Sequence, residues 1–150
     1  MRTPTLLLLI TVASASLAQG QPATVALVSA EEAARPDAPP RLVRGLFPGP
    51  TIRLAVPSES ALGQPLRSPL HLRIEFVPHN GSRVDPSSVR MTYLKSPMVD
   101  LTPRIAPAVA EQGIDLAQIA LPPGHHSFQI SATDSNGNRG VAVYTLSVAK

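Results

Sequence analysis

Apolar and polar residues alternate most regularly in two segments of the chain. In residues 51–56, Ile52, Leu54 and Val56 fall on one side, and in residues 70–77 apolar side chains again recur at every second position. A period of two places successive side chains on opposite faces of a strand. The pattern therefore predicts two strands of a sheet that has one buried and one hydrated face.

Shorter segments with the same period follow, and residues typical of turns separate them. Turns are expected at residues 78–81 and 85–88, where the Asp85 carboxylate can accept backbone N–H groups. Further strands are expected at residues 89–94, 119–121, 127–133 and 141–148. Six or seven short strands with regular turns over about 100 residues predict an all-β sandwich of two sheets.

The connection at residues 96–118 shows neither the two-residue period of a strand nor the roughly 3.6-residue period of a helix along its whole length. It contains a sequence that opens like a helix, with Thr102 as N-cap and Pro103 at the first helical position. Pro107 removes an interior donor and Gly113 can end a helix, so we expect one short helix within residues 102–112. A connection of this length either binds a partner or packs across a sheet edge, and the pattern leaves both open.

The first residues have the layout of a secretory signal peptide. A basic start at Arg2 precedes an apolar run at residues 6–12, and a small-x-small sequence ends at Ala18. The apolar run is shorter than the roughly 20 residues of a membrane-spanning helix. We therefore expect a signal peptide over residues 1–18, cleavage before Gln19, and no membrane insertion afterwards.

Residues 19–48 are rich in proline and alanine and contain one small apolar cluster. Such a segment buries too little apolar surface to offset the entropy of ordering it. We interpret it as a flexible tail that precedes a domain at residues 49–150. The alternative is a short strand at residues 24–28 that docks on the sheet.

The last thirty residues carry a resemblance to a known family. Residues 121–124 (Leu-Pro-Pro-Gly) and residues 133–138 (Thr-Asp-Ser-Asn-Gly-Asn), followed by an alternating strand at 141–148, resemble the end of bacterial immunoglobulin-like and fibronectin type III-like domains of exported proteins. The resemblance implies an immunoglobulin-like β-sandwich of about seven strands over residues 50–150. It says little about function, because such sandwiches host many unrelated roles.

Two segments contain residues that can bind metal ions. His125 and His126 are adjacent on a predicted strand and point to opposite faces, so we expect one at a sheet corner and one in water. Residues 134–138 begin with Asp134 and alternate oxygen ligands as a calcium loop does, but the bidentate carboxylate of such a loop is missing. We therefore predict a hairpin turn there, and predict no metal site and no cofactor.

Small periplasmic copper carriers of the CopC type are similar to this chain in size and in their closing turn, strand and hairpin. Members of that family resemble one another in a histidine at the mature N-terminus, where this chain is expected to carry Gln19. They often carry a methionine-rich or histidine-bearing loop as well, whereas this hairpin has no histidine. A copper-binding carrier is therefore the alternative function.

The composition argues against several classes of function. The chain has no cysteine and no tryptophan, and after loss of Arg2 its 12 basic and 10 acidic residues leave a net charge of +2. The basic residues are scattered, which argues against nucleic-acid binding. Motifs for a nucleophile elbow, a phosphate loop or a zinc protease are absent, so we predict no enzyme and no catalytic residue.

The sequence thus predicts a non-enzymatic interaction or accessory protein of the bacterial envelope. It is expected in the periplasm or outside the cell, and its expected partner is another envelope or secreted protein.

Overall fold

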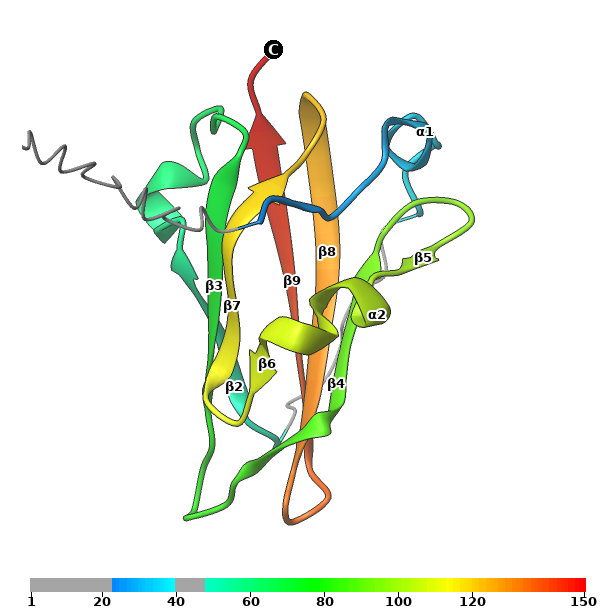
Figure 1. The fold of residues 1–150 in the computed structure, drawn as a ribbon. Coiled ribbons are helices and arrows are strands. Elements are labelled where there is room, and N and C mark those ends of the chain that lie inside the picture. Colours follow the sequence, from blue (N-terminus) through cyan, green and yellow to red (C-terminus); the bar gives the residue numbers. More distant parts are fainter. Residues whose placement is uncertain (1–22, 40–47) are drawn as a thin grey trace, which may run out of the picture.

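Two β-sheets make up most of the structure, a computed structural model that describes residues 23–39 and 48–150 (Figure 1). The predicted signal peptide and its cleavage site lie outside the described residues. The strands are β1 (Val25–Ala26), β2 (Thr51–Val56), β3 (Leu70–Val77), β4 (Val84–Tyr93), β5 (Val99–Asp100), β6 (Val109–Ala110), β7 (Gly113–Ala120), β8 (Gly124–Asp134) and β9 (Arg139–Val148). The helical elements are α1 (Ala30–Ala33), α2 (Thr102–Ile105) and the 3₁₀ turns η1 (Glu59–Ala61) and η2 (Ala106–Ala108).

One sheet has the order β1-β7-β3-β2, with β6 also paired to β7, and the other has the order β5-β4-β8-β9. All pairs are antiparallel except β1 with β7. The predicted all-β, two-sheet sandwich is confirmed, although the described part of the chain has nine strands rather than about seven. The additional strands are the two-residue segments β1, β5 and β6, which are too short to show a period.

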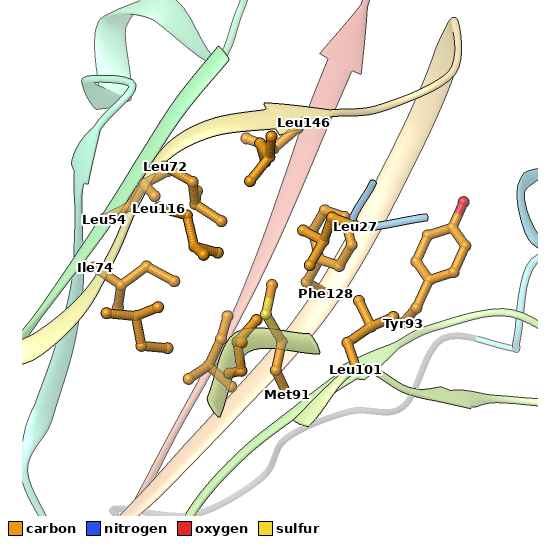
Figure 2. Packing of buried hydrophobic residues seen from close by; sticks show 14 of the residues in the cluster. Leu27, Leu54, Leu72, Ile74, Met91, Tyr93, Leu101, Leu116, Phe128 and Leu146 are labelled. Carbon is orange, nitrogen blue, oxygen red and sulfur yellow. The ribbon is translucent and has the colours of Figure 1, made fainter. Parts of the chain in front are cut away.

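The hydrophobic core lies between the two sheets. On β3, Leu72, Ile74 and Phe76 are buried, while His71 and Arg73 on the opposite face are exposed. Apolar side chains of β4, β7, β8 and β9 belong to the same cluster, and Figure 2 shows part of their packing. Because the chain has no cysteine, no disulfide contributes to stability and burial of these side chains is the main stabilising contribution.

Strands β2 and β3 begin and end where the sequence predicts, whereas β7 is much longer than the predicted strand at residues 119–121. A register shift opposite Leu70 and Leu72 interrupts the ladder between β3 and β7. Ile114 and Leu116 are buried in phase with each other, and Ile119 is buried one residue out of that phase. Because of this bulge, β7 has no continuous period of two along its length, and its full extent could not be predicted from the sequence.

The short helix expected within residues 102–112 is present, but the predictions of its N-cap and of its end at Gly113 are wrong. The helix α2 covers only Thr102–Ile105, and η2 and β6 follow it, so Gly113 begins β7 instead of ending a helix. Leu101 is the N-cap residue, and the carboxylate of Asp100 accepts the Thr102 N–H at 2.9 Å. Leu101 and Ile105 are fully buried, so this connection packs into the core.

The prediction of a flexible tail is wrong for residues 23–39. In this segment β1 pairs in parallel with β7, Leu27 and Val28 are buried in the core, and Asp37 pairs with Lys95 beyond β4. Figure 1 shows the segment crossing from β7 to the neighbourhood of β5. The docking alternative at residues 24–28 describes its start correctly. Burial of two apolar side chains and several polar contacts offset the ordering entropy.

Candidate functional site

The two adjacent histidines occupy different environments, as their alternation on a strand predicts. His125 is exposed, whereas the side chain of His126 is buried beneath the corner of β8. His126 Nε2 lies 2.7 Å from the Pro122 carbonyl oxygen, and Nδ1 lies 2.8 Å from the Tyr93 hydroxyl. Both ring nitrogens of His126 are therefore occupied, and the pair does not converge on one point.

These contacts determine the tautomer of the neutral His126 ring. A carbonyl oxygen only accepts, so Nε2 carries the proton and donates it to Pro122, and Nδ1 accepts from Tyr93. Burial lowers the pKa of His126, the hydrogen bond to Pro122 raises it, and the nearby charge of Lys95 lowers it further, so the pKa lies below the ordinary value. Burial also raises the pKa of Tyr93 to about 12, which keeps its hydroxyl protonated as a donor.

The buried Lys95 lies next to Tyr93 and His126, and its role was not predicted from the sequence. The side chain of Lys95 is 8% exposed, and its Nζ lies 2.6 Å from Asp37 Oδ1 and 5.6 Å from the centre of the Tyr93 ring. Lys95 and Asp37 are 58 positions apart. No local pattern could have revealed that pair, because only the path of residues 23–39 brings it together.

A second ion pair, which is partly buried, joins α1 to α2. Arg104 donates from Nη1 and Nη2 to the two carboxylate oxygens of Glu32, at 2.7 and 2.6 Å, and from Nη1 to the Leu27 carbonyl at 2.8 Å. Ser29 and Glu32 also form a capping box at the start of α1. The Ser-x-x-Glu spacing is a sequence signal for such a box, and it could have identified the ordered helix.

Asp134 lies at a hairpin turn, as predicted. Its Oδ1 accepts the backbone N–H groups of Asn136 and Asn138, each at 2.9 Å, and the side chain is buried. Burial raises the pKa of Asp134, but the hydrogen bonds from Asn138, Ser82 and Asn136 outweigh it, so the pKa lies below the ordinary value. The carboxylate therefore stabilises the turn between β8 and β9.

The outer edge of β7 contains a gap between two short strands. β6 pairs with β7 at residues 113 and 114, and β1 pairs with it at residues 119 and 120. Within the described part of the chain no strand pairs with residues 115–118 on that side. The Phe76 N–H donates to Gln112 O, so the alternation of the ladder directs the N–H and C=O groups of Asp115 away from β3 and into the gap.

A groove of about 250 Å³ lies against this gap. Its lining includes Ala23, Val25, Pro107, Ala108, Ala117 and Gln118. A second groove of about 220 Å³ shares Ala108 and Asp115 with the first and continues along β6. Each groove has three alanine or glycine residues in its lining, and Ala108 belongs to both, so another backbone can approach the edge of β7 at these positions.

Charged side chains beside these grooves are paired with one another. His71 Nε2 lies 2.7 Å from Asp115 Oδ1, and Arg73 lies 3.7 Å from Glu75. Arg104, at the rim of the first groove, is held by Glu32. Besides these paired charges, the edge presents backbone groups and several small apolar side chains.

The described residues contain no cluster of three or more histidine, aspartate or glutamate side chains placed to hold a metal ion. Within the same ranges no helix is long and apolar enough to cross a membrane. All buried side-chain nitrogen and oxygen atoms there have a hydrogen-bond partner. Among protein-family models, curated proteins and solved structures, no match to this chain is found.

Proposed function

We propose that this chain is an exported, non-enzymatic immunoglobulin-like module that binds an extended segment of another envelope or secreted protein along the edge of β7. The strand arrangement supports the immunoglobulin-like assignment. The order β7-β3-β2 beside β4-β8-β9 corresponds to strands E-B-A and C-F-G of that fold. The signal-like N-terminus supports export to the periplasm or the cell exterior.

The gap at residues 115–118 of β7 is the observation that supports the proposed binding site. Two strands already pair with this edge, one parallel and one antiparallel, so its backbone groups accept added strands in either direction. Adding a strand to a sheet edge is a common way to bind an extended peptide, because main-chain hydrogen bonds supply affinity. The grooves beside the gap leave room for that peptide.

The other long edge strand, β9, is less suitable for binding an added strand. Leu66 pairs with Val148 at one end of β9, with the Leu66 N–H donating to Ser147 O at 2.7 Å. At the other end the backbone at Pro50 lies so close that no Cβ fits on Gly140. Neighbouring chain segments cover both ends of β9, as they do at β7, but near the middle of β9 the Tyr144 hydroxyl is also bonded to the backbone of β2.

The chemistry of the groove indicates the kind of segment that binds. Its acidic and basic side chains already pair with one another, so a charged peptide would gain little from them. Ala108 and Ala117 present short apolar side chains to the groove. The preferred ligand is therefore an extended, uncharged segment.

Site-specific photo-crosslinking tests this proposal. A photoreactive amino acid is placed at Gln118, in the groove, or at Thr145, an exposed position on the opposite sheet, and the chain is crosslinked in the envelope of its bacterial host. We expect a discrete adduct from position 118 and none from position 145. Mass spectrometry of the adduct also reads the N-terminal residue, which should be Gln19.

A matched pair of variants controls for charge. Ala117→Lys fills the groove, and Thr145→Lys adds the same charge away from it. Loss of strand addition should lower adduct yield by about tenfold or more in Ala117→Lys alone, which corresponds to roughly 1.4 kcal/mol of binding free energy. Equal yields in the two variants, both folded by circular dichroism, would refute binding at β7.

A further inference from the structure

Two asparagine–glycine sequences lie in exposed turns of the sandwich. Asn80 and Gly81 lie between β3 and β4, and Asn136 and Gly137 lie between β8 and β9. All four residues are exposed, and a Cβ built on either glycine meets open space. Access of water therefore does not distinguish the two sequences.

Asparagine followed by glycine can deamidate without an enzyme. The backbone nitrogen of the glycine attacks the side-chain carbon Cγ, a new C–N bond closes a succinimide ring, and the side-chain amide leaves as ammonia. Water then opens the ring at either carbonyl and yields aspartate or isoaspartate. The attacking nitrogen must first lose its proton, so a backbone N–H held in a hydrogen bond reacts more slowly.

The two glycine N–H groups differ in this respect. The Gly137 N–H donates to the Asp134 carbonyl at 2.9 Å, and Asp134 Oδ1 also holds the neighbouring N–H groups of Asn136 and Asn138. Hydrogen bonds to Asp134 thus hold three successive backbone N–H groups, those of residues 136–138, in the turn between β8 and β9.

At the other turn, the Ser82 N–H donates to the His79 carbonyl at 3.0 Å and closes the turn around Asn80 and Gly81. The Gly81 N–H, between these groups, donates to no acceptor in the described part of the chain. Asn80 has a φ of 54°, in the left-handed region, and Gly81 has a φ of 70°. Positive φ at both central residues is typical of a type I′ turn, whose closing hydrogen bond uses the N–H of the fourth residue and not that of the third.

We propose that Asn80 is a modification site at which the folded protein deamidates spontaneously, and that Asn136 is protected by its turn. The co-reactant is water, and the products are ammonia and an aspartyl or isoaspartyl residue. Isoaspartate adds one carbon to the backbone and a negative charge between β3 and β4. The change would mark aged molecules at this end of the sandwich.

Peptide mapping by mass spectrometry tests the proposal on the full mature chain. The protein is incubated at a mildly alkaline pH, where it stays folded, and in urea, where it is unfolded. In the folded chain Asn80 should deamidate several times faster than Asn136. In urea the two rates should become similar, because glycine follows both residues. Equal rates in the folded chain, or a faster rate at Asn136, would overturn the proposal.

Substitutions provide an independent readout on an isoelectric focusing gel. Asn80→Gly keeps the positive φ of the turn and should abolish the first acidic species, whereas Asn136→Gly should leave it unchanged. Asp134→Ala removes the carboxylate that holds the second turn and should raise the rate at Asn136. An acidic species that persists in Asn80→Gly with the wild-type rate would contradict the assignment.

Discussion

His126 combines full burial with hydrogen bonds at both ring nitrogens, and burial favours the neutral ring. Protonation of Nδ1 would remove the acceptor of the Tyr93 hydroxyl and would place a positive charge near the buried ammonium of Lys95. Asp37 is the acidic group that opposes this effect, and its carboxylate is already paired with Lys95. The ring is thus a structural group whose protonation opposes folding.

The stability of the protein should therefore fall with pH below about 6.5. The unfolded chain takes up a proton on His126 at the ordinary pKa of 6.5, whereas the folded chain does so only at lower pH. Between these values the unfolded state binds more protons, so the free energy of unfolding decreases as the pH falls. Urea denaturation at several pH values between neutral and mildly acidic measures the slope.

His126→Gln should reduce this slope, and His125→Gln at the exposed neighbouring position should not. Both variants remove one histidine, so any difference between them reports on burial. Identical slopes in the two variants would show that His126 does not control the pH dependence.

At the scale of elements, the segment 23–39 closes one flank of the sandwich. It starts as β1 on one sheet, inserts Leu27 and Val28 between the sheets, and ends at Lys95 beside the other sheet. Its central polar anchor is the ion pair between Glu32 and Arg104. The hydrogen bonds from Arg104 lower the pKa of Glu32 to about 2, against burial, which raises it.

Glu32→Gln should lower the free energy of unfolding at neutral pH by about 2 kcal/mol. This is below the roughly 3–5 kcal/mol of a fully buried pair, because the Arg104 side chain is 36% exposed. In the wild type this contribution is complete above pH 4.5 and is lost as the pH falls toward 2, since the folded pKa is depressed. Chemical denaturation at neutral and acidic pH measures both effects.

Glu31→Gln is the matched control, because Glu31 is the exposed neighbour in the same helix. It should change stability by less than about 0.5 kcal/mol. A loss of equal size in both variants would indicate a general effect of acidic residues in the first turn of α1.

At the scale of the whole molecule, the two sheets meet along β2 and β9. The Tyr144 hydroxyl on β9 donates to the Ile52 carbonyl at 2.7 Å and accepts the Leu54 N–H at 3.1 Å. The Leu54 N–H lies where the β2–β3 ladder shifts register, so the hydroxyl satisfies a donor at that irregularity. Burial raises the pKa of Tyr144, so the hydroxyl keeps its proton.

Tyr144→Phe should therefore cost about 1–2 kcal/mol, because it leaves two backbone groups without their partner. Thermal or urea unfolding measures the loss. Val143→Ala, at an exposed position on the same strand, is the control and should cost less than about 0.5 kcal/mol. Equal midpoints for Tyr144→Phe and the wild type would show that the hydroxyl does not join the sheets.

The sequence by itself determined the strands with an unbroken period of two, such as β2 and β3, and the turn around Asp134. These features depend on local alternation and on hydrogen bonds between neighbours in the chain, so residue order is sufficient to predict them. From them followed the all-β class and the separation of His125 from His126 on opposite faces of a strand.

Only the tertiary structure decided the docking of residues 23–39, the partners of His126 and the gap at residues 115–118 of β7. Each depends on contacts between residues far apart in the chain, such as Glu32 with Arg104 and Asp37 with Lys95. The register shift in β7 and the two-residue strands β1 and β6 leave no period to detect. Such contacts arise only when the whole chain packs, because no local pattern encodes them.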